Sequence, residues 1–158
     1  VGGDAPSKEV FMHRAMYQAR SDAGGVVHLH STMATAVGCL PDVDPDNPIP
    51  PLTPYFVMRV GRRMPIVRYF RPGDPAMEPA IHAAAKDARA VLLANHGPVV
   101  SGKTLTDAVY AATDAHFLAS RYSASMSLGT CATGLPKGTP GSGTLPSKYV
   151  GLSQCGHM

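Results

Sequence analysis

The sequence lacks tryptophan altogether, and it is poor in cysteine and in charge. Of its 158 residues three are cysteines and 16% are charged. The cysteines are odd in number and have no CxxC spacing, so the sequence predicts neither a disulfide framework nor a thiolate metal site. No apolar run reaches the length of a membrane span, and the first residues have no signal-peptide pattern. We therefore expect a cytoplasmic protein with reduced thiols and no membrane partner.

A concentrated cluster of positive charge is also missing. The formal net charge is +3, and the densest basic stretch is the "GRR" of residues 61–63. A nucleic-acid surface needs a stripe of cations that neutralises many phosphates, so we expect no nucleic-acid partner. A small anionic substrate suits this modest excess better. The hydrophobic content of 44% and the length predict one globular domain.

Segments with helical and strand patterns alternate along the chain. Helical spacing and capping residues predict helices over 7–20, after Ser31, from Asp74 and from Thr104. Runs of β-branched and apolar residues predict strands over 23–30, 55–61 and 64–70, and on both sides of the "NHGP" turn. Six prolines between residues 41 and 54 predict an irregular loop. The alternation favours an α/β layered domain, while periodicity leaves a parallel or a mixed sheet open.

The last part of the chain changes in composition. After Met126, 18 of 32 residues are Gly, Ser, Thr or Pro, and no apolar period is visible. We expect one domain over residues 1–126 and a disordered tail over residues 127–158.

Two histidines stand in the apolar stretch "VVHLHSTMATA". Side chains at i and i+2 of a strand project from one face, so His28 and His30 are predicted to share a face and to form half of a metal site. Two histidines on an exposed strand face, with no ligand, are the alternative. The "NHG" sequence places His96 at the end of another strand, where glycine allows a sharp turn. A turn histidine bonded to its own backbone is the alternative there.

Three histidines with a vacant fourth position form the ligand set of a catalytic zinc site. Glu9 is the fourth candidate, because it falls in the first turn of the helix that leads into the histidine strand, where the helix dipole stabilises a carboxylate. Dipole compensation alone is the alternative role. The other histidines have no partner at site spacing, and we expect them on the surface or in helix packing: His13, His82, His116 and His157.

The motifs "PSKE", "VVHLHS" and "LLANHG", in this order and spacing, resemble the class II aldolase and adducin-head family. The resemblance covers about residues 5–112. It implies a three-layer α-β-α fold around a mixed, mostly antiparallel sheet, N-terminally truncated here, and a homotetramer with sites at subunit borders. It also implies that His28, His30 and His96 bind Zn²⁺, or another divalent ion such as Mn²⁺ or Co²⁺. Glu9 would be the proton-transfer group and an optional fourth ligand.

The stretches "PPLTPYFVMRVGR" and "VLLANHGPVVSG" are similar to a bacterial decarboxylase branch of this family. The likeness implies a lyase that converts a phosphorylated 3-oxo sugar acid, 3-oxo-tetronate 4-phosphate, to dihydroxyacetone phosphate and carbon dioxide. It also implies a catalytic role for Tyr55, which would reach a neighbouring subunit's site. Ser7 and Lys8, at a helix N-terminus beside Glu9, are candidates for binding substrate phosphate or carboxylate, although Lys8 could equally be solvated.

Two other functions remain open from the sequence. One is aldol cleavage or 4-epimerisation of a sugar phosphate, such as fuculose or ribulose phosphate, by the same ligands. The other is a non-catalytic, adducin-like interaction module. Retention of the three histidines and Glu9 argues against the module, because a binding scaffold has no need of a buried imidazole cluster.

Overall fold

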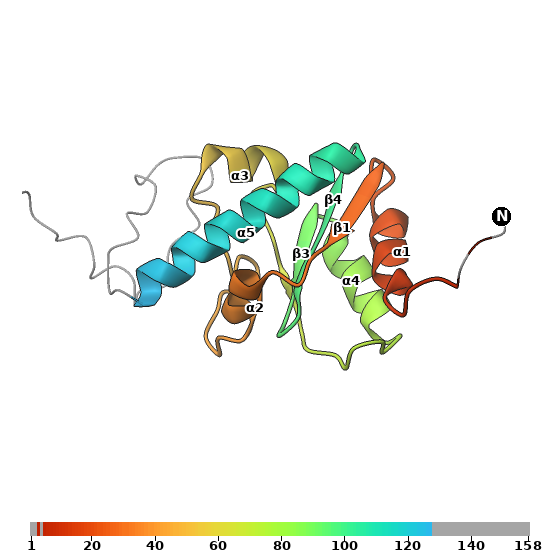
Figure 1. The fold of residues 1–158 in the computed structure, drawn as a ribbon, viewed down its shortest axis with the longest axis horizontal. Helices are drawn as coiled ribbons and strands as arrows, with labels where there is room; N and C mark the ends of the chain where they lie inside the picture. Colours follow the sequence, from red (N-terminus) through yellow and green to blue (C-terminus); the bar gives the residue numbers. More distant parts are fainter. Residues whose placement is uncertain (1–2, 4, 128–158) are drawn as a thin grey trace, which may run out of the picture.

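A computed structural model describes residues 3 and 5–127 of the chain. A four-stranded sheet lies between two layers of helices, so the expected three-layer α-β-α arrangement is confirmed (Figure 1). The elements in chain order are α1 (Val10–Ala19), β1 (Gly25–His28), α2 (Thr32–Gly38), α3 (Pro54–Arg59), β2 (Ile66–Val67), α4 (Met77–Ala85), β3 (Ala90–Leu93), β4 (Gly97–Gly102) and α5 (Leu105–Ser127).

The sheet is mixed and mostly antiparallel, as expected. Its strand order is β1-β4-β3-β2, with β1 and β3 antiparallel to β4 and β2 parallel to β3. The β1–β4 register places Gly25 opposite Gly102 at one end and His28 opposite Val99 at the other. The β1–β4 pair thus has the "SDAGG" turn at one end and the "NHG" turn at the other.

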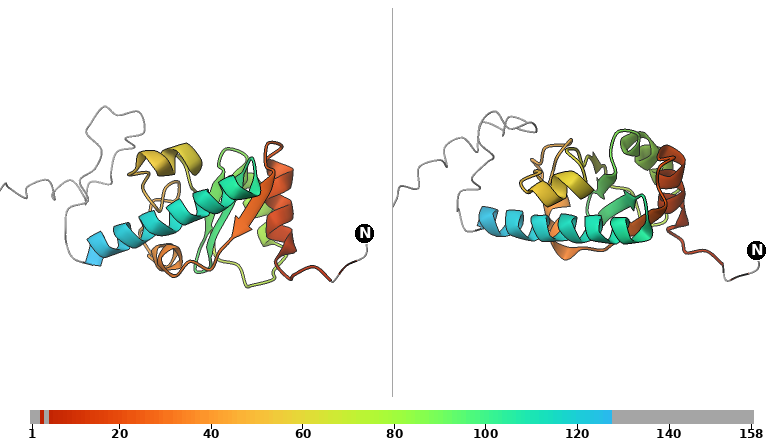
Figure 2. Two further views of the ribbon diagram at one scale, coloured as in Figure 1. Left: turned by 45° about the horizontal axis from the view of Figure 1, so that its top comes forward. Right: turned by 90° about the horizontal axis from the view of Figure 1, so that it is seen from above.

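Each face of the sheet has its own hydrophobic core. Successive side chains of a strand point to opposite faces, so Val91 packs with α1 and α4 while Leu92 packs with α2, α3 and α5. Figure 2 shows the same division from two further directions, with α5 crossing one face and α1 and α4 on the other. Val26 belongs to the α1–α4 side, and His28, two residues later, follows it on that face.

The strand predicted over residues 55–61 is wrong, because this segment forms helix α3. Thr53 caps the helix by accepting a hydrogen bond from the Phe56 N–H at 3.2 Å, and Pro54 occupies the first turn. Phe56 and Val60 are fully buried at helical i, i+4 spacing. Burying a side chain of this kind stabilises a fold by roughly 1.5–3 kcal/mol, which outweighs the strand preference of the β-branched residues.

The other predicted elements form with shifted ends. Strand β1 stops at His28, so His30 lies beyond the regular strand. Helix α1 begins at Val10, which puts Glu9 at its N-cap position and not in its first turn. Ser31 caps α2 as expected, with its hydroxyl accepting from the Ala34 N–H at 3.3 Å.

Within residues 3 and 5–127, none of the helices combines the length and the apolar character needed to cross a bilayer. The tail predicted over residues 127–158 lies, apart from its first residue, outside the described residues, and the one-domain division stays a prediction.

Candidate metal centre

Four of the predicted site residues come together at one end of β1 and β4. One ligand atom from each of Glu9, His28, His30 and His96 can be chosen so that all four lie within 4.8 Å of one another. The three imidazole rings form a triangle, with centroids 4.8–5.0 Å apart. Residues from three distant parts of the chain therefore share one small space.

His28 is fixed in the tautomer that a metal ligand needs. Its Nδ1 lies 2.9 Å from the Pro98 carbonyl oxygen. A carbonyl oxygen only accepts hydrogen bonds, so Nδ1 carries the proton and Nε2 presents its lone pair. That Nε2 is buried and has no hydrogen-bond partner in the described part of the chain. An unsatisfied buried acceptor costs free energy, which a cation would remove.

Burial also keeps the His28 imidazole neutral. Desolvation lowers the pKa of His28 below its usual value, and the nearby His96 acts in the same direction. The Pro98 carbonyl and Glu9 partly oppose this shift. A neutral imidazole is the form that binds metal ions.

The "NHG" turn presents His96 to the same point. Asn95 has φ of 59° and Gly97 has φ of 147°, so the backbone turns sharply on both sides of the histidine. A side chain on Gly97 would also meet the Leu29 carbonyl. The Nε2 of His96 lies 3.1 Å from that of His30 and 3.2 Å from Glu9 Oε1.

Glu9 directs its carboxylate at the histidines. It makes no side-chain bond to the end of α1, although it occupies the N-cap position. Its Oε1 lies 3.8 Å from His30 Nε2, and its Oε2 lies 3.9 Å from His28 Nε2. The carboxylate is partly exposed, so it borders both the histidine cluster and solvent.

These residues fit a divalent cation. Zinc bonds of about 2.0–2.2 Å to nitrogen and oxygen put neighbouring ligand atoms about 3–4 Å apart, which is the range of the contacts above. Nitrogen and carboxylate donors suit zinc and related ions. The orphaned Nε2 of His28 gives independent support, because it is an acceptor with no donor.

The remaining predicted site residues lie apart from this cluster or at its edge. Ser7 accepts a hydrogen bond from the Glu9 N–H at 3.2 Å and so adjoins the site. Lys8 is exposed. Tyr55 lies on α3, is 63% exposed and contacts the Arg59 guanidinium, 5.4 Å from its ring centre. The helix that carries Tyr55 packs against α5.

Two supporting contacts escaped the sequence analysis. The Thr35 hydroxyl donates to the His96 carbonyl at 2.8 Å and braces the turn that carries this histidine. Ser31, next to His30, lies 2.7 Å from His116 Nδ1 on α5. His116 is exposed on α5, as expected, but it also ties that helix to the start of α2. No sequence signal identifies these pairs, which are 61 and 85 residues apart.

Comparison with known proteins gives the class of this domain. Residues 1–123 match the Class II Aldolase and Adducin N-terminal domain. The chain belongs to this family, as its motifs indicated.

Two curated relatives show which enzymes of the family the chain is similar to. The chain is 50% identical over 108 residues to 3-oxo-tetronate 4-phosphate decarboxylase of Haemophilus influenzae, a match that covers 68% of this chain and 51% of that protein. It is 32% identical over 120 residues to L-fuculose phosphate aldolase of Escherichia coli, covering 76% of this chain and 54% of that one. The chain thus spans about half the length of the curated relatives it matches.

Solved structures agree with the fold. YgbL of Klebsiella pneumoniae, described as a putative aldolase/epimerase/decarboxylase, superposes with a TM-score of 0.75 at 45% identity, covering 79% of this chain and 60% of that one. An L-fuculose 1-phosphate aldolase superposes with a TM-score of 0.73 at 29% identity, covering 86% and 61%.

Proposed function

We propose that this chain carries the metal site of a lyase that decarboxylates 3-oxo-tetronate 4-phosphate to dihydroxyacetone phosphate and carbon dioxide. The convergence of three imidazole nitrogens and one carboxylate is the observation that carries the proposal. The relatives named for this decarboxylase support the substrate, at 50% identity over two thirds of the chain. The proposed setting is the cytoplasm, and the proposed site-bearing domain is residues 1–126.

His28, His30 and His96 would hold a divalent ion, Zn²⁺ or a relative such as Mn²⁺ or Co²⁺, with Glu9 as an optional fourth ligand. When bound, the ion supplies Lewis-acid stabilisation of negative charge that develops on substrate oxygen.

The proposed reaction requires one proton transfer from Glu9. Loss of carbon dioxide from a β-keto acid breaks the bond to the carboxylate carbon and leaves the electron pair as an enolate. Glu9 would then donate a proton to the enolate carbon. The partly exposed Glu9 carboxylate beside the histidines can then take up another proton from water, which restores the acid for the next turnover.

Three other residues have proposed roles around this centre. Ser7 and Lys8, just before α1, would bind the phosphate or carboxylate of the substrate. Tyr55 would complete the site of a neighbouring subunit in a homotetramer. Its exposure is compatible with contact to another subunit.

Aldol cleavage or epimerisation of a sugar phosphate is the second candidate. It would use the same four ligands, and the 32% identity to L-fuculose phosphate aldolase favours it over unrelated chemistries. The non-catalytic, adducin-like module remains the third. The orphaned Nε2 of His28 argues against it, because a scaffold gains nothing from an unsatisfied buried acceptor.

Metal content and product formation test the proposal. We expect about one equivalent of divalent ion per chain in protein purified without chelator. We expect carbon dioxide from 3-oxo-tetronate 4-phosphate and no aldehyde from L-fuculose 1-phosphate. Glu9→Gln should lower turnover by about 10²–10⁴-fold, while His82→Ala, on α4, should leave metal content and turnover unchanged.

Three outcomes would contradict parts of this proposal. Aldehyde release from the sugar phosphate without carbon dioxide from the acid would favour the aldolase. A folded protein with no divalent ion, even after metal is added, would favour the interaction module. Full turnover in Glu9→Gln would remove the proton-transfer role.

A further inference from the structure

A second site lies at the opposite end of the β1–β4 pair from the histidine cluster. A cavity of about 200 Å³ opens there between the end of α1, the α3 helix and the start of α5. Its lining residues are Arg20, Asp22, Ala23, Met58, Arg59, Arg89, Ser101, Gly102, Lys103 and Asp107. At this end of the strand pair, Gly25 lies opposite Gly102. Three residues of strand, or about 10 Å, separate Gly25 from His28.

The cavity is cationic. Four of its lining residues carry positive charge and two carry negative charge. Asp22 forms an ion pair with Arg20 at 2.9 Å. The Asp107 carboxylate accepts a hydrogen bond from the Thr104 N–H at 3.1 Å. The pKa of Asp22 is held below its usual value chiefly by the hydrogen bond from Arg20, with a smaller contribution from Arg89. Asp22 therefore offsets Arg20, while the remaining lining cations outnumber Asp107, so the lining keeps a net positive charge.

Two of the cations keep donors available. Arg20 does not contribute in this way, because its Nε is buried from solvent and its Nη2 bonds to Asp22. Arg89 donates a hydrogen bond from Nη1 to the Met58 carbonyl at 3.3 Å, so its Nε and Nη2 remain as donors for a ligand. Within residues 3 and 5–127 the Lys103 ammonium has no ion-pair partner.

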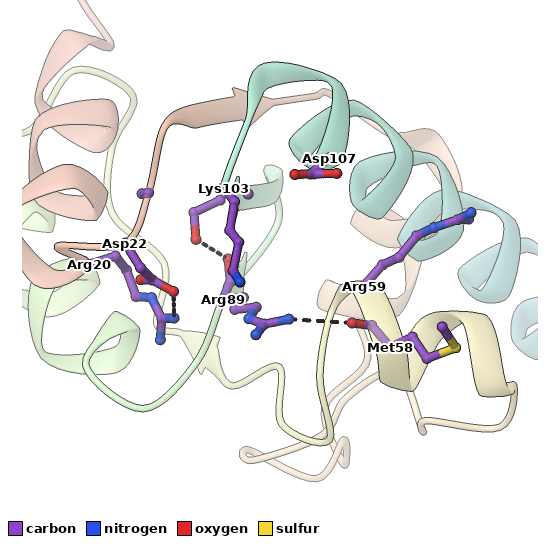
Figure 3. Close-up of a pocket in the computed structure, with 10 residues that line it drawn as sticks. Arg20, Asp22, Met58, Arg59, Arg89, Lys103 and Asp107 are labelled. Atoms are coloured by element: carbon purple, nitrogen blue, oxygen red, sulfur yellow. Dashed lines mark hydrogen bonds and ion pairs between the residues drawn. The ribbon is translucent and has the colours of Figure 1, made fainter.

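The arrangement of these side chains is visible in Figure 3. In this view Lys103 lies above Arg89 in the middle of the labelled residues, with Arg20 and Asp22 on one side and Met58, toward which the Arg89 guanidinium points, on the other. Arg59 points away from this group and pairs with Asp114 at 2.9 Å. Because Lys103 and Arg89 both line the cavity, an anion bound there would offset two positive charges.

We propose that this cavity binds a small phosphate-bearing anion. The Arg89 guanidinium, with Nε and Nη2 left over, and the Lys103 ammonium, with no ion-pair partner among the described residues, supply charge-assisted donors for phosphate oxygens. Pockets for drug-sized ligands measure about 300–1,000 Å³, so a cavity of about 200 Å³ suits inorganic phosphate or a short phosphomonoester. The N-terminus of α5 adds a favourable dipole at the rim.

This proposal does not depend on the lyase activity. The two sites occupy opposite ends of one strand pair, and they share no residue. Failure of either proposal leaves the other in place.

The test is anion binding by the full chain, freed of metal so that the histidine cluster does not capture the ligand. Inorganic phosphate, glycerol 3-phosphate and acetate are titrated by calorimetry at constant ionic strength. We expect saturable binding of both phosphates and much weaker binding of the carboxylate. Lys103→Gln and Arg89→Gln should each weaken phosphate binding by about tenfold or more, because each removes a charge-assisted hydrogen bond.

Lys86→Gln is the matched control. Lys86 is an exposed cation at the end of α4, outside the cavity, and its loss changes the net charge equally. Binding should be unchanged in this variant, and thermal unfolding should verify that all three variants are folded. Equal weakening in Lys86→Gln, or no saturable binding of either phosphate by the folded protein, would overturn the proposal. Tighter binding of glycerol 3-phosphate than of inorganic phosphate would identify an ester as the ligand.

Discussion

Two hydrogen bonds of its backbone groups hold His96 in place. Its carbonyl accepts the Thr35 hydroxyl at 2.8 Å, and its amide donates to the Leu93 carbonyl at 3.1 Å. The ring Nε2 can therefore meet His30 and Glu9 without rearrangement of the turn. A ligand fixed in this way loses little freedom when an ion binds.

Thr35→Val is expected to loosen the His96 turn. The substitution keeps the shape of the side chain but removes the donor to the His96 carbonyl. We expect a loss of about 1 kcal/mol in the free energy of unfolding and about tenfold weaker zinc binding. Urea denaturation and competition with a chromogenic chelator measure the two effects. Thr113→Val is the control, since that hydroxyl bonds the Val109 carbonyl of its own helix. Equal zinc affinity in both variants would contradict the bracing role.

Gly97→Ala is expected to be more damaging than a change at another left-handed glycine. Gly97 has φ of 147°, and an added Cβ would run into the Leu29 carbonyl. Gly61 has φ of 114° with open space around it, so Gly61→Ala incurs backbone strain alone, on the order of 1–3 kcal/mol. The Gly97 variant should lose more stability than this and should also bind added zinc more weakly than the wild type. A smaller loss of unfolding free energy than in Gly61→Ala, measured by urea denaturation, would show that the turn can accommodate the added methyl group.

At the scale of elements, the position of α1 decides where the Glu9 carboxylate points. Arg14 on α1 forms a two-pronged ion pair with Glu78 on α4, at 2.7 and 2.5 Å. Phe11, Met12 and Met16 of the same helix are buried against the α4 side of the sheet. The pair and the apolar contacts together set the angle at which the chain enters the site.

The Arg14–Glu78 pair gives a pH dependence to this packing. The hydrogen bond from Arg14 lowers the pKa of Glu78 below its usual 4.5. A depressed carboxyl pKa contributes stability that is fully present above 4.5 and is lost as the pH falls through the folded-state value. We expect wild type to melt above Glu78→Gln near neutral pH, with the difference closing under acid conditions.

Asp87→Asn is the control for that experiment, because it removes one exposed carboxylate outside the pair. Its melting temperature should stay close to that of wild type near neutral pH. High salt should also shrink the Glu78→Gln difference, since exposed ion pairs are screened. A difference between wild type and Glu78→Gln that persists unchanged into strong acid would exclude the ion pair as its cause.

At the scale of the whole molecule, the histidine cluster joins parts of the chain that are far apart in sequence. Glu9 precedes α1, His28 and His30 bracket the end of β1, and His96 lies between β3 and β4. An ion bound there would connect the α1 layer to three strands of the sheet. Binding to the folded state alone raises stability in proportion to the logarithm of the ligand concentration.

Metal removal is therefore expected to lower the melting temperature. At a free ion concentration of 100 times the Kd the bound ion contributes about 2.7 kcal/mol, or roughly 5–10 °C for a chain of this length. Differential scanning fluorimetry with EDTA, followed by an excess of Zn²⁺, measures the loss and its recovery. His28→Gln should be indifferent to both additions, and an equal response in that variant would show that zinc stabilises the protein elsewhere.

Local patterns in the sequence were sufficient for much of the fold and for the ligand set. Ser31 was recognised as a helix cap, and the apolar run before "NHG" as a strand, because caps and short buried strands depend on neighbouring residues. Residues 55–61 were misassigned because β-branched residues favour strands locally. The Thr53 cap and Pro54 at the helix start were the available counter-signals.

The motifs HxH and NHG and the glutamate after "PS" identify the side chains that could bind a cation, and with them the chemistry of the site. Only the packing of the folded chain brings their donor atoms together. It also chose the His28 tautomer through the Pro98 carbonyl, and it gathered Arg20, Arg89 and Lys103 around a cavity at the other end of the same strands. The physical reason is that side-chain type and spacing act over a few residues, whereas strand register and layer packing bring together groups more than sixty residues apart.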